Sequence, residues 1–260
     1  MTEALEKRIN MERPLISIIV PMYNAALFIE DTINTVINQT YTNWELIIVD
    51  DKSLDDSVRI VEKYLSSKIK LYKNDKNIGV GLTRNVGIEK SHGSYICFLD
   101  ADDLWDPYKL AKQLKFMNDN DYVFTYTGYV FSNSLGEPLG KKIYVPDRCS
   151  YKDYLKTTII WTSTVMIDMN YFSKADIYMP SLRRGEDGAT WLRLLGKIPY
   201  AYGLNEILSR YRRTGHSLSS NKFKSVLRVW NLYYKNENLG FLKGLYYFLH
   251  YCVNAVRKRL

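Results

Sequence analysis

The sequence contains few cysteines, and no pattern pairs them or arranges them to hold a metal. Only three occur among 260 residues, and they show neither CxxC nor any other metal-ligand spacing. This argues against a disulfide framework and against a cysteine-based zinc site. We interpret Cys97, Cys149 and Cys252 as reduced thiols of a cytosolic protein.

Long apolar runs are also missing. No segment reaches the roughly 18 uncharged apolar residues expected of a membrane-spanning helix. The nearest candidate, residues 239–256, is interrupted by Lys243, His250 and Asn254. Residues 1–13 are polar and charged, without the apolar run of a signal peptide. We therefore expect a cytoplasmic protein that is neither exported nor inserted across a membrane.

The composition is that of a folded, basic protein. Hydrophobic residues make up 46% of the chain, so it can bury a large core as one domain with appendages. The formal net charge is +8, and Lys and Arg are concentrated in residues 183–213 and 222–259. Such an excess suits a polyanionic partner, and three kinds fit: a diphosphate, an anionic membrane surface or nucleic acid.

The first half of the chain alternates short apolar runs with helical patterns, and each run ends in a loop rich in Asp, Asn, Gly or Pro. This alternation predicts an α/β fold with a mostly parallel, Rossmann-like sheet flanked by helices. In such sheets ligands bind beyond the carboxyl ends of the strands. The expected strands are residues 16–20, 46–49, 69–72 and 95–99, and the expected helices are residues 29–37, 55–64, 83–90 and one that begins near Pro107.

The second half is less regular. Residues 131–146 are rich in Gly, Pro and Ser and predict a loop or hairpin. A strand-like run at 164–167, a helix at 186–195 and a polar loop at 212–221 follow, and the last forty or so residues show two helical patterns. We accordingly expect an N-terminal polar segment (1–13), a main domain (14–220) with parts 14–130 and 131–220, and a C-terminal basic, aromatic helical region (221–260).

An acidic cluster follows the fourth expected strand. Asp100, Asp102 and Asp103 lie within four positions, where three carboxylates can hold a hard cation such as Mg²⁺ or Mn²⁺. A solvated turn is the alternative, because Asp is common in turns. Asp51 ends a neighbouring strand and is expected to face the same crevice.

Five short segments, each at a junction between a strand and a loop, belong together. They are Val20–Asn24, Ile48–Ser53, Asn77–Gly81, Thr83–Asn85 and Phe98–Asp103. In this order they resemble the inverting family 2 glycosyltransferases, closely over residues 14–105 and more loosely through 187–219. The resemblance implies a GT-A type fold, with a nucleotide-binding part at 14–130 and an acceptor-binding part at 131–220. It also implies metal-dependent transfer of a sugar from a nucleotide-sugar, with UDP favoured, to a glycan hydroxyl.

The resemblance assigns the donor site residue by residue. Asp51 matches the residue that recognises the base, and Arg84 is expected near the diphosphate. Asp100, Ala101 and Asp102 match the DxD element, with Asp102 the more direct ligand of Mn²⁺ or Mg²⁺ and Asp100 contacting ribose or metal. The cation would neutralise the departing nucleoside diphosphate. A turn or helix N-cap is the alternative for Asp51. Further nucleotide-pocket residues implied by the resemblance are Pro21, Tyr23 and Asn24.

A transferase also needs a base for the acceptor hydroxyl. Glu186 and Asp187 resemble the family's ED element, whose aspartate is that base. The alternative is simple charge complementarity at a helix N-terminus. Trp161 and Thr162 lie where relatives line the acceptor side, and a core position is the alternative for Trp161.

A later loop, residues 211–219, resembles one that closes over the diphosphate. Arg212 and Arg213 are expected to bind phosphate oxygens, as guanidinium groups do bidentately. Many relatives carry a His where Thr214 stands here, and the displaced His216 is a candidate metal ligand, a phosphate contact or an ordinary surface residue.

Two other interpretations stay open. A nucleotidyltransferase or nucleotide-sugar hydrolase can use a related fold and the same metal, but Pro21–Asn24 is neither basic nor rich in Gly as its phosphate loop would be. A membrane-surface or nucleic-acid binding module is suggested by the charge and the many Tyr residues. We expect no nucleic-acid partner, because the aromatics follow apolar helical patterns. The family resemblance points to a lipid-linked or other growing surface glycan as acceptor. The C-terminal region either docks on the inner membrane surface or packs on the catalytic domain.

Overall fold

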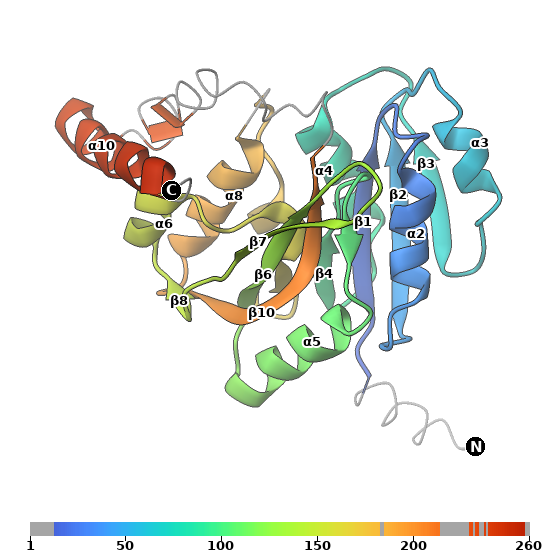
Figure 1. Cartoon of the computed structure of the whole chain (residues 1–260), viewed down its shortest axis with the longest axis horizontal. Coiled ribbons are helices and arrows are strands. Elements are labelled where there is room, and N and C mark those ends of the chain that lie inside the picture. The colour runs from blue at the N-terminus through green and yellow to red at the C-terminus, as the bar shows by residue number, and fades with distance from the viewer. Residues whose placement is uncertain are drawn as a thin grey trace.

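A computed structural model gives the fold, and it describes residues 13–182, 185–213, 229–230, 232–233, 237 and 239–257. The core of the first half is a parallel sheet (Figure 1). Strand β1 (Ile16–Met22) pairs in parallel with β2 (Trp44–Asp50) and β4 (Tyr95–Phe98), and β2 pairs with β3 (Ile69–Lys73). The connecting helices are α2 (Ile29–Ile37), α3 (Ser57–Glu62) and α4 (Val80–Lys90).

Strands β1, β2 and β4 form because their side chains are buried on both faces of the sheet. All seven residues of β1 are buried, and all but Ser17 are apolar, so the strand shows no alternation of apolar and polar residues. Ile18 and Val20 belong to the core on the side of α2, and Ile19 belongs to the core on the side of α4. The period of two in a strand thus divides one sequence run between two cores.

The second half continues the sheet with mixed pairing, in the order β3-β2-β1-β4-β9-β6-β10-β5. Strand β9 pairs antiparallel with both β4 and β6, and β10 runs parallel to β6. A hairpin joins β6 to β7, as expected for residues 131–146. The strands are β5 (Leu104–Trp105), β6 (Phe124–Ser132), β7 (Pro138–Ile143), β8 (Arg148–Cys149), β9 (Met166–Asp168) and β10 (Ala201–Arg212).

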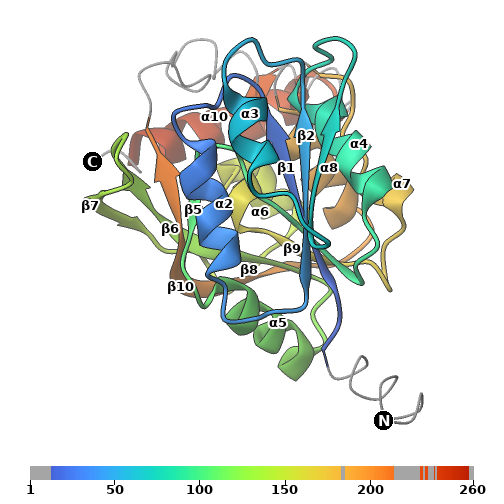
Figure 2. The ribbon, with the colours of Figure 1, turned by 90° about the vertical axis from the view of Figure 1, so that its right-hand side faces the viewer.

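Helices cover both faces of this sheet (Figures 1 and 2). Helix α8 buries Trp191, whose ring lies 6.0 Å from that of Phe98 and 5.4 Å from that of Phe124. Helix α8 has the bounds expected from the sequence. The remaining helical elements are α5 (Lys109–Asn120), α6 (Tyr151–Thr157), the 3₁₀ helix η1 (Thr162–Thr164), α7 (Lys174–Ile177), α8 (Glu186–Leu195) and α10 (Phe241–Arg257).

Helix α10 accounts for one of the two helices expected near the C-terminus, and it packs on α6. Most of residues 214–240 and all of residues 1–12 lie outside the described part of the chain, so the other C-terminal helix and the N-terminal polar segment stay predictions. Within the described part, no helix is both long enough and apolar enough to cross a membrane.

Candidate active site

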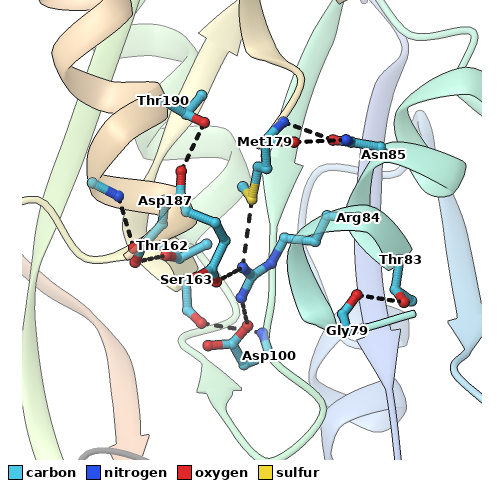
Figure 3. A network of polar contacts seen from close by, with 12 residues as sticks. Gly79, Thr83, Arg84, Asn85, Asp100, Thr162, Ser163, Met179, Asp187 and Thr190 are labelled. Atoms are coloured by element: carbon cyan, nitrogen blue, oxygen red, sulfur yellow. Dashed lines mark hydrogen bonds and ion pairs between the residues drawn. The ribbon is translucent and has the colours of Figure 1, made fainter. Parts of the chain in front are cut away.

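Arg84 is the centre of the site. It lies on α4, nearly buried, with Nη2 2.6 Å from Asp100 Oδ1 and Nη1 3.0 Å from Glu186 Oε1 (Figure 3). Burial alone would lower the pKa of Arg84, but the charges of Asp100 and Glu186 raise it above its ordinary value. One guanidinium therefore joins the loop after β4 to the first turn of α8.

The approach of α4 to α8 depends on a glycine. A Cβ at Gly81 would lie 2.8 Å from Glu186 Cγ and 3.4 Å from the carbonyl oxygen of Pro180. A larger residue at this position would push α8 away from α4 and lengthen the pair between Glu186 and Arg84. Gly81 thus has a packing role against the site.

The acidic loop after β4 holds its three carboxylates in different environments. Asp103 is fully buried and accepts from Ser163 Oγ at 2.7 Å and from the Arg212 amide at 3.2 Å. Asp102 is half-buried, and burial together with the charge of Asp100 raises its pKa to about 6. Asp103 therefore anchors the loop, and Asp100 and Asp102 are the carboxylates left facing the site.

These carboxylates suit a hard cation through their oxygen donors. Within the described residues, however, no group of three or more His, Cys, Asp or Glu side chains is placed to enclose a metal. A cation held by Asp102 and Asp100 would complete its shell with water and phosphate oxygens, which is how Mg²⁺ is commonly held in phosphate-transfer sites. The donor set therefore fits Mg²⁺ or Mn²⁺ bound together with a diphosphate.

Asp187 lies beside Glu186 in the first turn of α8, half-buried. Its Oδ2 accepts from Thr162 Oγ1 at 2.8 Å and its Oδ1 accepts from the Gly188 amide at 2.7 Å. The chain enters α8 through Gly185 in the left-handed region, with φ of 82°. Asp187 is thus an oriented carboxylate at the edge of the site, with lone pairs left to accept a further proton donor.

The 3₁₀ helix η1 connects the two acidic elements. Thr162 donates to Asp187, while Ser163 Oγ accepts from the Asp100 amide at 3.1 Å (Figure 3). Ser163 Oγ also donates to Asp103. Both residues are buried, with Thr162 only 1% exposed. Thr162 was expected at the acceptor side, and the structure places its hydroxyl on the carboxylate of Asp187.

The residues expected to hold the nucleotide gather at the carboxyl ends of β1 and β2. Asp51 is buried and accepts from Asn74 Nδ2 at 2.9 Å and from the amides of Ile78 and Gly79 at 2.8 Å each. It therefore ties the end of β2 to the start of α4. Pro21 is buried within β1, Tyr23 is exposed, and the Asn24 amide donates to Ser53 Oγ.

Arg212 and Arg213 differ in spite of their adjacency. Arg212 is 1% exposed, and its guanidinium pairs with Asp31 at 3.0 Å, donates to the Ser134 carbonyl and lies 4.9 Å from the Phe28 ring. Arg213 is exposed, with its guanidinium 3.7 Å from the Phe131 ring centroid. Arg213 is thus the more accessible cation, whereas Arg212 joins α2 to the end of β10. His216 and Thr214 lie outside the described residues.

An aromatic cluster adjoins η1. The Trp161 ring lies 4.9 Å from that of Tyr129 and 4.8 Å from that of Tyr211, and Phe131 contacts both tyrosines. All four rings are half-buried, so Trp161 is neither a fully buried core residue nor an isolated surface one. Tyr129 and Phe131 are absent from the candidate site residues that the sequence singles out, and Tyr211 is included there only as the first residue of the loop 211–219. The period of two in β6 is the signal that places Tyr129 and Phe131 on one face.

The chain matches the family model "Glycosyl transferase family 2" over residues 17–176. This protein belongs to glycosyltransferase family 2. It is 43% identical over 95% of its length to TuaG of Bacillus subtilis, a glycosyltransferase assigned to teichuronic acid biosynthesis, and the match covers 98% of that protein. It is 35% identical over 95% of its length to "UDP-Glc:alpha-D-GlcNAc-diphosphoundecaprenol beta-1,3-glucosyltransferase WfgD" of Escherichia coli, with 96% of that chain covered.

Solved glycosyltransferases share the fold. S. aureus TarS in complex with UDP-GlcNAc superposes with a TM-score of 0.71 at 20% identity, covering 92% of this chain and 71% of that one. The mannosyltransferase PcManGT from Pyrobaculum calidifontis, in complex with GDP-Man and Mn²⁺, gives a TM-score of 0.66 at 16% identity, covering 94% and 75%. The GT-A fold expected for this family 2 glycosyltransferase is confirmed.

Proposed function

We propose that this glycosyltransferase is inverting and metal-dependent, and that it transfers a hexose from a UDP-sugar to a hydroxyl of a lipid-linked saccharide during the assembly of a cell-surface polysaccharide. The name of TuaG supports a role in the assembly of a cell-surface polysaccharide. The name of WfgD supports both the UDP-sugar donor and an acceptor on a polyprenyl diphosphate. The UDP-GlcNAc complex of TarS supports the same donor class.

The ion pairs of Arg84 carry this proposal. They bring the acidic loop after β4, which suits a diphosphate and its cation, next to the start of α8. The first turn of α8 carries the half-buried carboxylate of Asp187. A nucleotide-binding protein without transfer chemistry would need the first element and not the second. The juxtaposition therefore supports group transfer from a nucleotide-sugar.

Asp187 acts as the general base. It accepts the proton of the acceptor hydroxyl as that oxygen attacks the anomeric carbon from the face opposite the diphosphate. The new carbon–oxygen bond forms as the bond to the diphosphate breaks, and UDP leaves with the bonding electron pair. A single displacement of this kind inverts the anomeric configuration.

The donor is held at the carboxyl ends of β1, β2 and β4. Asp51 meets the base, and Asp102 with Asp100 would hold Mn²⁺ or Mg²⁺, which would neutralise charge on the diphosphate when bound. Arg213, exposed just after β10, offers a cation to the phosphate oxygens. The ion pairs of Arg84 with Asp100 and Glu186 hold the acidic loop next to α8. Pro21, Tyr23, Asn24 and Ala101 complete the nucleotide pocket in this proposal.

The acceptor binds on the side of η1. The rings of Trp161, Tyr129 and Tyr211 offer apolar faces next to Thr162 and Asp187, and such faces suit the C–H surface of a sugar. Transfer takes place at the cytoplasmic side of the membrane that carries the lipid-linked acceptor.

The test is a screen of UDP-sugars for UDP release, with Mn²⁺ or EDTA, on native protein and on Asp102→Asn. We expect one or a few donors to be turned over with metal, stimulation by a polyprenyl-diphosphate saccharide, and loss of turnover in EDTA and in the variant. Full activity of the variant in EDTA would overturn the metal proposal. UDP release without any glycan product, under all acceptors tested, would favour a nucleotide-sugar hydrolase.

A further inference from the structure

Helix α10 presents two opposite apolar faces, and only one of them packs on the protein. On the inner face Gly244 is buried, and Tyr247, Phe248 and Tyr251 contact the core beneath α6 and α8. Asn254 Nδ2 donates to the Lys156 carbonyl of α6 at 3.1 Å. These contacts fix the rotation of the helix about its own axis.

The outer face carries an exposed apolar stripe. Leu242 is 80% exposed, Tyr246 52%, Leu249 56% and Val253 51%. Successive members are four, three and four residues apart, which places them on one side of an α-helix. A contiguous apolar surface of this kind marks an interaction site, because single exposed apolar residues are common but aligned ones are not.

The charge around this stripe has one sign. Residues 239–260 contain four basic residues and no acidic one, and Lys243 lies exposed beside Leu242. Among the described side chains of α10, Lys243 is the one Lys, Arg, Asp or Glu, and an apolar helix face beside a cation is typical of a helix that lies in the interface of an anionic bilayer. A protein partner would be expected to find polar groups of both signs along the edge of the stripe. Residues 239–260 contain no acidic residue, so α10 offers no anionic group there.

The position of α10 agrees with this function. In both ribbon views α10 lies toward the end of the molecule where the carboxyl ends of β1 and β2 lie, and the candidate active site is at that end (Figures 1 and 2). Helix α6, on which α10 packs, also packs on α8. A Cβ at Gly188, next to Asp187, would lie 3.2 Å from the Tyr154 hydroxyl of α6. Packing through α6 therefore connects α10 to the helix that carries Asp187.

We propose that α10 docks the enzyme on an anionic lipid bilayer through Leu242, Tyr246, Leu249 and Val253, with Lys243 at the headgroups. The inference rests on the proposed lipid-linked acceptor. Docking brings the active site to the surface in which that acceptor is anchored, so that only its saccharide has to reach Asp187.

Flotation of the full-length chain with vesicles tests the docking surface. Vesicles of phosphatidylethanolamine with phosphatidylglycerol are compared with vesicles of phosphatidylcholine, at low and high salt. We expect binding to the anionic vesicles, weakened by salt. A variant with serine at positions 242, 246, 249 and 253 should bind about tenfold less or weaker still, because the apolar contribution is lost. The matched control is Leu65→Ser with Leu139→Ser, which changes leucines of similar exposure elsewhere and should bind like native protein.

Thermal unfolding checks that the variants fold, which is expected because every changed side chain is exposed. Equal flotation of native protein and stripe variant would overturn the proposal, as would equal binding to neutral vesicles. If the native chain is a dimer and the stripe variant a monomer, with neither bound to vesicles, the stripe is a self-association surface and the proposal is wrong. Flotation requires no turnover, so its failure leaves the proposed transfer reaction intact. Conversely, the stripe variant should still use a short-chain, water-soluble acceptor at the native rate.

Discussion

Arg84 and Asp100 form an ion pair of 2.6 Å between α4 and the loop after β4, and the arginine is almost completely buried. The other terminal nitrogen of Arg84 pairs with Glu186, which is 102 residues away in the sequence. A buried charge of this kind is stable only while its partners are present. Arg84 therefore fixes the distance between the acidic loop and α8, in addition to any contact with the diphosphate.

Replacement of Arg84 with Gln should destabilise the protein and abolish transfer. It leaves Glu186 buried without a counter-charge, and breaking a buried pair in this way costs about 3–5 kcal/mol. Arg84→Lys keeps a charge but cannot span both carboxylates, so we expect an intermediate loss. Urea denaturation measures the free energy of unfolding. Arg59→Gln is the control: its pair with Asp56 is exposed and should contribute less than about 1 kcal/mol. Native stability in Arg84→Gln would show that the pairs are not structural.

Asp187→Asn should keep UDP-sugar binding and lose transfer. The amide preserves the shape of the side chain but cannot accept the proton of the acceptor hydroxyl, so the rate should fall by about 10² to 10⁴. Calorimetry with UDP-sugar and metal measures binding, and product formation measures turnover. The control is Asp119→Asn, which changes a carboxylate in an exposed pair with Lys115. NMR of the product adds a second check, because retention of the donor's anomeric configuration would contradict a single displacement with Asp187 as base.

Thr162 is expected to act as a positioning residue for that base. Its Oγ1 lies 2.8 Å from Asp187 Oδ2, and the residue is buried. Thr162→Val keeps the side-chain volume and removes the donor, so kcat should fall by about 10-fold to 100-fold while KM for the UDP-sugar stays unchanged. Thr162→Ser keeps the donor and should restore most of kcat. An increase in acceptor KM at constant kcat would instead support the acceptor contact expected from the sequence.

Strands β1 and β2 could be predicted because each is a short apolar run that the sheet buries on both faces. Strand β10 was missed for a physical reason. Its sequence mixes Asn205, Glu206 and Arg210 with apolar residues, and its pairing with β6 shifts register between Leu204 and Ile207 and again between Ile207 and Ser209. These irregularities hide the period of two on which a prediction depends.

Some residues of the candidate site could likewise be proposed from the sequence, and others could not. Asp102 and Asp187 could be proposed as site residues because each lies in a short local motif at the end of a strand or the start of a helix. The partners of Arg212 could not, because Asp31 is 181 residues away and nothing local indicates the pair. Nor does anything local indicate that Ser163 donates a hydrogen bond to Asp103, which lies 60 residues earlier in the sequence. Contacts that close over such separations depend on the whole fold and are invisible in local sequence.

Lys109 provides a pH-dependent test of the core beside the acidic loop. It is fully buried, its Nζ donates to Gln113 Oε1 at 2.8 Å, and it lies 4.1 Å from the Trp105 ring. Burial lowers the pKa of Lys109 from its ordinary value of 10.5 to about 8. Below about pH 8 the lysine is charged in both the folded and the unfolded chain, so the cost of burying the charge is fully present.

Between about pH 8 and 10.5 the unfolded chain binds more protons at Lys109 than the folded protein does, so the free energy of unfolding rises with pH in this window. Lys109→Met has no such group. From pH 7 to pH 9.5 the native protein should therefore gain about 2 kcal/mol relative to this variant. Urea denaturation of both proteins across this range measures the difference, in which the ionisation of all shared groups cancels. Parallel curves for native protein and Lys109→Met would mean that Lys109 titrates as an ordinary, solvated lysine.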